Sequence, residues 1–198
     1  MRELKSIEEN ILDRALFLIG KKHSLNISVR AIAEEAKVNV SAINYYFRTK
    51  EEMMRQIREL YISNTLSISA IMADTALERE EKLITTANEI MEYIIRYPGI
   101  TVLLRDARER ADETSQRILK VSNEMTEGIN FLLDQYIGKS EGNLYKRILF
   151  WSAINYPVED NGFTSYDTEL LNSRENRISY IRQLLWMLRQ QAEPNAIN

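Results

Sequence analysis

The sequence of 198 residues has no cysteine, and it has only three prolines and six glycines. Without cysteine, disulfide bonds, thiol nucleophiles and thiolate metal sites are excluded. The scarcity of proline and glycine leaves long segments uninterrupted, and apolar residues recur along them at spacings of three and four, which favours an all-α fold. A chain of this length is long enough to bury a hydrophobic core.

Long apolar runs are also missing. In the first residues, MRELKSIEENIL, acids stand where a signal peptide has its apolar segment, and no later run approaches the ~18 to 20 apolar residues of a membrane span. We therefore expect a cytoplasmic protein with no membrane partner. The single histidine, His23, cannot build a histidine-rich metal site, and the motifs GxSxG, GxGxxG, HExxH and the P-loop are absent. We expect no catalytic residues, no metal, no cofactor and no enzymatic activity.

Charge is unevenly distributed along the chain. Residues 1–60 carry 11 Lys and Arg against 9 Asp and Glu, whereas residues 61–198 carry 15 against 20. The basic excess at the amino-terminal end is only a weak indication of a polyanionic partner, because the arrangement of charges in space decides whether they form a patch. A plain solvated surface remains an alternative. Carboxylates in residues 106–113 alternate with arginines, which favours a solvated ion-pair face over a metal or catalytic site.

Hydrophobic periodicity predicts about nine helices. Ser6 and Ser28 are candidate N-caps of the first two, and Glu8, Glu9 and Asp13 fall on the face of the first helix opposite its apolar stripe. The longest expected loop, YPVEDNGFTS, precedes the last helix. The expected helices span residues 7–22, 29–36, 40–47, 50–73, 80–96, 100–110, 114–137, 142–156 and 168–191.

The stretch AKVNVSAINYYFRTKEEM, residues 36–53, concentrates aromatic, polar and basic side chains. A helix over residues 40–47 places Ile43 and Phe47 on one side and the polar residues on the other. Two short helices packed on a longer first helix match the helix-turn-helix plan, in which the second short helix enters the major groove. Tyr46 could equally be a packing residue. The chemistry of the exposed side predicts base contacts from Ser41, Asn44 and Tyr45, and phosphate contacts from Ser28, Tyr46, Arg48, Thr49 and Lys50.

The segment SVRAIAEEAKVNVSAINYYFRTKEEM, residues 28–53, resembles the TetR family of bacterial transcriptional regulators nearly position by position. The resemblance is specific over about residues 7–57, and beyond them only the number and lengths of the helices agree. It implies a homodimer of nine-helix subunits that binds double-stranded operator DNA and a small-molecule effector of unknown identity. It also implies a helix-turn-helix DNA-binding domain over residues 1–49 and an effector-binding and dimerisation domain over residues 50–198.

The chain departs from the family pattern at several positions. The family usually has glycine where this chain has His23 and Lys37, and both positions often require a positive φ. Lys37 would add a cation near the DNA backbone. The first tyrosine of the family's recognition helix is replaced here by Asn44, and a frequent basic residue by Val40. Asparagine can bond adenine through two hydrogen bonds, and valine can meet a thymine methyl group. Lys37, Val40 and Asn39 complete the predicted DNA-binding set.

The carboxy-terminal part is predicted to hold an effector and a second subunit. Its aromatic and methionine side chains are more often core than pocket, yet an effector cavity is built from the same residue types. The predicted lining consists of Met91, Tyr93, Met125, Phe131 and Trp151. The apolar stripes of the last two helices exceed one amphipathic face, which indicates a partner helix. The predicted dimer interface consists of Leu144, Ile148, Asn155, Ile178, Ile181, Leu185 and Leu188.

The sequence thus favours a ligand-responsive repressor. In this interpretation a homodimer binds a pseudopalindromic operator and releases it when a small molecule binds. A transcriptional activator, or a regulator that responds to a partner protein, fits the same residues. Two further alternatives are an all-helical enzyme and a helical adaptor that uses its amino-terminal module on protein.

Overall fold

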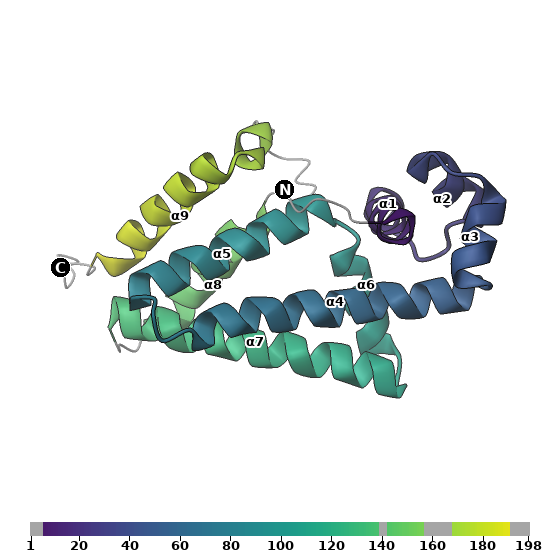
Figure 1. The fold of residues 1–198 in the computed structure, drawn as a ribbon. Coiled ribbons are helices and arrows are strands. Elements are labelled where there is room, and N and C mark those ends of the chain that lie inside the picture. The colour runs from purple at the N-terminus through teal and green to yellow at the C-terminus, as the bar shows by residue number, and fades with distance from the viewer. Residues whose placement is uncertain (1–5, 139–141, 157–167, 191–198) are drawn as a thin grey trace, which may run out of the picture. The chain divides into compact units, whose positions relative to one another are not determined.

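The computed structural model describes residues 6–138, 142–156 and 168–190, and within these ranges the chain is helical with no strand. This confirms the predicted all-α class (Figure 1). Of the expected loop YPVEDNGFTS, all but the first residue lies outside the described residues. The elements are α1 (Ile7–Lys22), α2 (Val29–Ala36), α3 (Val40–Phe47), α4 (Lys50–Ala73), α5 (Arg79–Arg96), α6 (Ile100–Glu109), α7 (Glu113–Ile137), α8 (Asn143–Asn155), the 3-10 helix η2 (Thr168–Asn172) and α9 (Arg174–Arg189).

Capping residues determine where α1 and α2 begin and end. The hydroxyls of Ser6 and Ser28 accept hydrogen bonds from backbone amides three residues later, at 3.1 and 3.2 Å, and so act as the expected N-caps. His23 and Lys37 follow the two helices with φ angles of 48° and 56°, in the left-handed region. The positive φ implied at both positions is therefore confirmed. Because neither residue is glycine, each conformation costs about 1–2 kcal/mol.

The end of α7 agrees with the sequence prediction, whereas the start of α9 differs from it. α7 ends at Ile137, and Gly138 follows with a φ of 81°, as expected of a glycine that terminates a helix. The single helix expected over residues 168–191 is wrong in its first turns, since η2 comes first and α9 begins only at Arg174. The reason is local, because the Ser173 hydroxyl accepts a hydrogen bond from the Asn176 amide at 3.5 Å and caps a new helix.

The helices pack as two compact units, whose boundaries fall inside α4, α5 and α7. The first unit consists of Met1–Leu66 with Arg96–Asn123, and the second of Ser67–Ile95 with Glu124–Asn198. The first therefore contains α1, α2 and α3, most of α4, all of α6 and the beginning of α7. This division describes packing, whereas the predicted boundary between residues 49 and 50 concerns function and stays a prediction.

In the first unit α1 packs against α2, α3 and α6. Its core side chains include Ile11 and Leu16 of α1, which are fully buried. Ile43 and Phe47, at 3% and 1% exposure, fix the inner face of α3 in that core, as the spacing of these residues predicts. The burial of one face leaves the opposite face of α3 outward.

Asp13 does not lie on a solvated face of α1, contrary to the expectation from helical spacing. Its side chain is 1% exposed. One carboxylate oxygen accepts hydrogen bonds from Arg96 at 2.8 and 3.0 Å and from the Tyr97 hydroxyl at 2.9 Å, and the other accepts from Arg14. Burial by itself raises the pKa of Asp13, but these hydrogen bonds outweigh burial and hold that pKa below its ordinary value.

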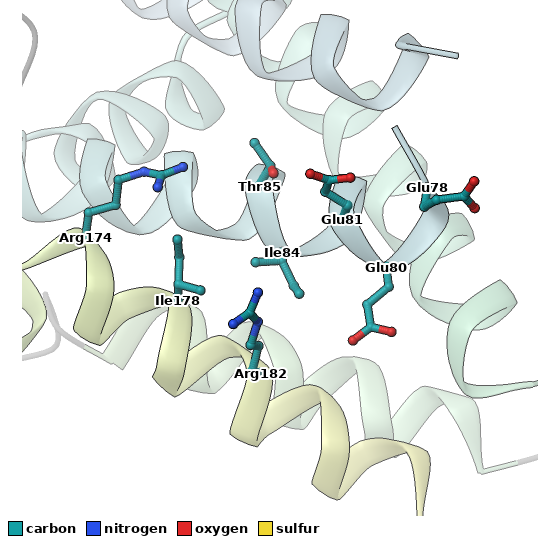
Figure 2. Close-up of a pocket in the computed structure, with 8 residues that line it drawn as sticks. All are labelled: Glu78, Glu80, Glu81, Ile84, Thr85, Arg174, Ile178 and Arg182. Atoms are coloured by element: carbon teal, nitrogen blue, oxygen red, sulfur yellow. The ribbon is translucent and has the colours of Figure 1, made fainter. Parts of the chain in front are cut away.

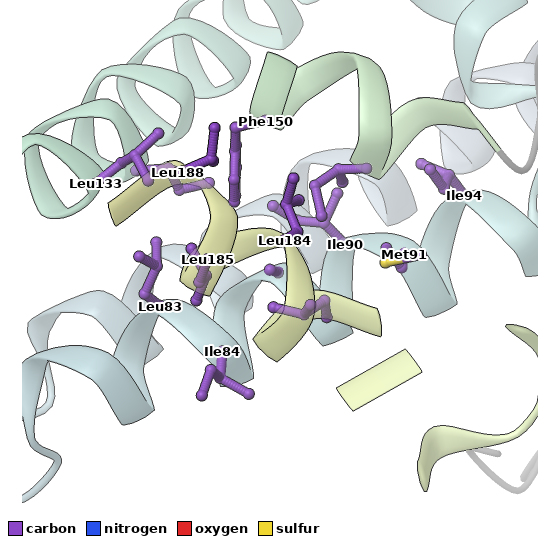
Figure 3. Close-up of a cluster of buried hydrophobic side chains, with 14 of the residues drawn as sticks. Leu83, Ile84, Ile90, Met91, Ile94, Leu133, Phe150, Leu184, Leu185 and Leu188 are labelled. Atoms are coloured by element: carbon purple, nitrogen blue, oxygen red, sulfur yellow. The ribbon is translucent and has the colours of Figure 1, made fainter. Parts of the chain in front are cut away.

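The second unit has its own hydrophobic core (Figure 3). Residues of α5, among them Leu83 and Met91, meet Leu133 of α7 and Phe150 of α8, all of them fully buried. α9 covers this core with Ile181, Leu184, Leu185 and Leu188. Arg177, at the start of α9, is 3% exposed and donates hydrogen bonds to Asn88 and Glu92 of α5, at 3.0 and 2.5 Å.

Candidate nucleic-acid interface

The outward face of α3 carries an unusual set of exposed side chains. Tyr45 is 81% exposed and Val40 is 38% exposed, and Ser41 and Asn44 are exposed between them. Tyr46 is 36% exposed, and its ring meets that of Tyr45 edge to face with centroids 5.3 Å apart. Tyr46 is thus partly packed, as one of the two interpretations of this residue requires. The face presents a hydroxyl, an amide and a phenol without any carboxylate.

The turn before α3 is held by its own asparagine. The Asn39 side-chain oxygen accepts hydrogen bonds from the Ala42 amide and the Ser41 hydroxyl, both at 2.7 Å. Asn39 therefore acts as the N-cap of α3, and it fixes the orientation of Ser41. These two bonds use neither the side-chain amide nitrogen of Asn39 nor the acceptor capacity of the Ser41 hydroxyl, and both residues are exposed.

Arg48 joins α3 to α4 in a strained conformation that the sequence did not indicate. Its φ and ψ are 58° and −50°, and the Thr49 amide donates a hydrogen bond across it to the Phe47 carbonyl at 2.5 Å. This is a γ-turn with positive φ, which is rare for residues other than glycine. Strain of this kind collects at functional sites. Phe47 buried on one side and α4 on the other hold Arg48 in an exposed position.

The start of α4 presents the Thr49 hydroxyl beside two acidic residues in the first turn, Glu51 and Glu52. The Thr49 hydroxyl accepts a hydrogen bond from the Glu52 amide at 3.1 Å, and its own hydrogen remains available to a phosphate. Hydrogen bonds from Arg55 and Gln56 lower the pKa of Glu52 to about 2. The charge of Glu52 is therefore matched by Arg55, with an N–O distance of 2.6 Å.

Three cations flank the outward face of α3. Lys37 and Arg48 are exposed, and Lys50 is partly buried at the first position of α4. In the part of the chain that the structure describes, no carboxylate pairs with any of the three. The arrangement places positive charge on both sides of the exposed face. This suits a polyanion such as DNA, in which base edges lie between the charged phosphates.

All eleven residues predicted for DNA binding fall in one segment of the first unit, residues 28–50, and ten are exposed. Ser28 lies at the beginning of α2, and Lys37 lies in the turn. The others lie on α3, at its two ends and at the start of α4. Their contacts with DNA stay a prediction. The sequence missed the positive φ of Arg48 because no glycine or asparagine stands there to indicate it.

A pocket of about 430 Å³ lies in the second unit between α5 and α9. Figure 2 shows Ile178 and Arg182 on α9 pointing toward α5, which carries Ile84 and Glu81. The remaining lining side chains are Glu78, Glu80, Thr85 and Arg174. The pocket combines an apolar floor with charges of both signs, and nothing in the sequence indicated it.

The five residues predicted to line an effector cavity do not line this pocket. Met91 is fully buried in the core of the second unit, and Met125 and Trp151 pack against that core. The Trp151 indole donates a hydrogen bond to the Asn130 side chain at 2.9 Å. Tyr93 is partly buried, and Phe131 is 61% exposed. Their role in effector binding stays a prediction.

The residues predicted for the dimer interface separate into two groups. Leu144 and Ile148 of α8 are 62% and 54% exposed, and Asn155 and Ile178 are partly exposed. Ile181, Leu185 and Leu188 are instead buried in the core of their own chain, as the second unit shows. The apolar surface of these helices comes from other side chains. They are Tyr145 and Leu149 of α8, at 71% and 58% exposure, and Trp186 and Met187 of α9, at 58% and 52%.

Two other kinds of site are not found among the described residues. No group of three or more His, Cys, Asp or Glu side chains in them is placed to hold a metal ion. Among the carboxylates near α6, Asp106 takes part in ion pairs with Arg58 at 3.2 Å and Arg110 at 2.8 Å. No helix in these ranges has the length and apolar character that a membrane crossing requires.

Known proteins are similar to this chain in the sequence of its amino-terminal module and in its fold. Residues 11–57 match the family model "Bacterial regulatory proteins, tetR family". The probable HTH-type transcriptional regulator YttP of Bacillus subtilis (strain 168) is 34% identical over 91 residues, which cover 44% of this chain and 44% of that protein. The match thus spans less than half of that relative.

Solved structures extend the likeness over most of the chain. A TetR-family transcriptional regulator from Bordetella parapertussis 12822 has a TM-score of 0.67 and 14% identity, covering 93% of this chain and 94% of that one. AibR, solved in complex with isovaleryl coenzyme A and operator DNA, has a TM-score of 0.59 and 12% identity, covering 88% and 97%. At such identities the likeness shows the fold alone. The tetR family model thus matches the amino-terminal module, and over most of the chain the fold is similar to that of a solved TetR-family regulator.

Proposed function

We propose that this protein is a transcriptional regulator that binds double-stranded operator DNA as a homodimer and releases it when a small molecule binds. The observation that carries the proposal is the outward face of α3. There Ser41, Asn44 and the 81% exposed Tyr45 stand between cations that no described carboxylate pairs, while the buried Ile43 and Phe47 anchor the opposite side of the helix. Exposed polar groups on a rigid helix, flanked by phosphate-binding groups, are what major-groove recognition requires.

The roles divide by position. Ser41, Asn44 and Tyr45 would meet base edges, with Val40 against a thymine methyl group. Phosphates would be bound by Lys37, Arg48 and Lys50 and by the hydroxyls of Ser28 and Thr49. These two hydroxyls stand at the beginnings of α2 and α4, where backbone amides and the helix dipole favour an anion. Phosphate contacts position the protein, and base contacts select the sequence.

The apolar side chains that α8 and α9 leave exposed support the proposed dimer. Leu144, Ile148, Leu149 and Trp186 are each more than half exposed. A monomer rarely leaves so many large apolar side chains in water without a partner. A second copy with two-fold symmetry would present two α3 helices to successive major grooves of a pseudopalindrome.

Ligand response is supported by a protein of similar fold. AibR, which has a similar fold, was solved with both a coenzyme A thioester and operator DNA. A small molecule bound in the second unit would favour a conformer whose two α3 helices no longer match successive grooves. Only the difference between its affinities for the two conformers can drive release. If release from DNA raises transcription, the protein is a repressor. If release lowers transcription, the protein is an activator.

Selection from a random double-stranded DNA pool tests DNA binding. The full-length protein should enrich a motif with two-fold symmetry and bind it more tightly than random DNA, with an affinity that falls as salt concentration rises. A second binding series with the region upstream of the protein's own coding sequence should give the same preference. Equal affinity for selected and random DNA at every salt concentration would overturn the proposal.

A further inference from the structure

Asp13 holds the helix-turn-helix in place, an inference that rests on the DNA-binding function proposed above. Asp13 is a fully ionisable group at 1% exposure, on α1, beneath the helix-turn-helix. A carboxylate can be buried at this level only if hydrogen-bond donors satisfy it. Three side chains do so, namely Arg14 on the same helix and Arg96 and Tyr97 at the end of α5.

The bonds of Asp13 form part of a chain of polar contacts that begins on α2. The Arg14 guanidinium lies 3.9 Å from the Glu35 carboxylate of α2 and also bonds Asp13. A second tie joins the two helices, because the Asn10 amide donates a hydrogen bond to the Ala36 carbonyl at 2.9 Å. α2 in turn packs against α3. These polar contacts and the packing of α2 on α3 hold the helix-turn-helix against one side of α1.

On its other side, α1 is fastened to the corner between α5 and α6. Arg96 donates two hydrogen bonds to Asp13, at 2.8 and 3.0 Å, and the Tyr97 hydroxyl donates a third at 2.9 Å. The guanidinium of Arg96 also lies over the Tyr97 ring, 5.2 Å from its centroid. Backbone contact supports the same junction, since Gly20 of α1 approaches Pro98 and Gly99 without room for a Cβ atom. Polar and backbone contacts therefore hold one orientation of α1 against this corner.

We propose that Asp13 is a positioning residue for DNA binding, which fixes the orientation of the helix-turn-helix relative to α6. A dimer can engage two half-sites only if both α3 helices keep one spacing. Holding that orientation before DNA is met avoids an ordering cost on binding. Since Arg96 is the last residue of α5, unwinding of that last turn would remove its two hydrogen bonds to Asp13.

The test uses distance measurements in the full-length protein, which its lack of cysteine makes straightforward. Spin labels are attached to cysteines introduced at the exposed residues Glu34 of α2 and Arg108 of α6. Labelled protein is diluted with unlabelled protein so that only distances within one subunit are seen. Asp13→Asn removes the charge, and Tyr97→Phe removes one hydrogen bond in case the first variant folds poorly. Glu59→Gln breaks an exposed ion pair with Arg117 in the same unit and serves as the matched control.

Both test variants should broaden the distance distribution, whereas Glu59→Gln should keep that of the parent. The dissociation constant for the DNA selected by the parent should rise about tenfold in Asp13→Asn and about twofold to fivefold in Tyr97→Phe, since preorganisation is lost. The slope of log affinity against log salt concentration should differ from that of the parent by less than about one released ion, because no phosphate contact is removed. Folded variants with the parent's distance distribution, or with a broad distribution and unchanged affinity, would overturn the inference. Failure of the parent to bind DNA would instead overturn the proposed function, and the distances would still test the junction.

Discussion

A Cβ atom placed on Gly20 would lie 2.4 Å from the backbone nitrogen of Gly99. Placed on Gly99, it would lie 2.4 Å from the carbonyl oxygen of Leu16. α1 and the turn before α6 therefore touch through their backbones, and side chains are excluded from both contact positions. Close approach, and not a positive φ, requires glycine at these two sites.

Gly20→Ala should destabilise the protein. The new methyl group meets backbone atoms, which cannot move aside as a side chain can, so the free energy of unfolding should fall by roughly 1–3 kcal/mol. Thermal denaturation would show this as a midpoint lowered by several degrees. Gly128→Ala is the control, because its methyl would meet only the flexible end of Met72, at 3.0 Å. Since alanine is the better helix former, this control should match the parent or exceed it.

Lys37→Gly should raise stability and weaken DNA binding at the same time. The substitution relieves the left-handed conformation at φ 56°, with a net gain of about 0.5–1 kcal/mol after the extra backbone entropy of glycine. Lys37→Ala separates the two effects, since it removes the cation and keeps the strain. Calorimetry and binding titrations at several salt concentrations would measure both quantities. A stabilised Lys37→Gly protein with the parent's DNA affinity would show that Lys37 does not contact phosphate.

Asp13 should make the protein sensitive to acid. Its pKa is lower in the folded state than in the unfolded chain, so ionised Asp13 stabilises the fold above about pH 4. That contribution disappears as the pH falls through the lowered pKa, because protonation then favours the unfolded state. Denaturant titrations of the parent and Asp13→Asn from pH 7 to pH 3 should show the two stabilities converging at the acidic end. A constant difference over this range would contradict the assignment.

Asn44→Ala and Lys50→Ala should weaken DNA binding in different ways. Loss of the amide should cost about 1–3 kcal/mol on the selected sequence and relax the preference at one base pair, with little change on random DNA. Loss of the cation should weaken binding to all sequences. It should also reduce the slope of log affinity against log salt concentration by about one released ion. Competition assays with single-base variants of the selected DNA would distinguish the two. The same pattern from both substitutions would argue against the division into base and phosphate contacts.

Substitutions on the exposed faces of α8 and α9 should separate a dimer. Ile148→Glu and Trp186→Glu each place a charge where apolar surface would be buried between subunits. Sedimentation or light scattering should then show monomers at concentrations where the parent is dimeric. Leu66→Glu, at a residue of α4 that is 48% exposed, should leave the oligomeric state unchanged. Dimers that persist in both test variants would place the interface elsewhere.

Local sequence rules were sufficient for most of the helices. Ser6 and Ser28 marked helix starts because an N-cap hydroxyl acts within three residues of itself. The same rules separated Ile43 and Phe47 from the outward residues of α3, since the period of a helix fixes which side chains share a face. The candidate DNA-binding surface, which lies within one continuous segment, was therefore predictable from sequence.

The tertiary structure decided what depends on distant residues. Helical spacing put Asp13 among polar side chains, but only the fold brings Arg96, 83 residues away, to pair with it. Ile181 and Leu188 belonged to a stripe that could have faced a second subunit, and the core of the second unit takes them up instead. A sequence pattern shows that a side chain prefers apolar or charged surroundings, because that preference is a property of the residue. Which segment supplies those surroundings depends on packing between residues far apart in the chain, and so it is settled only when the chain folds.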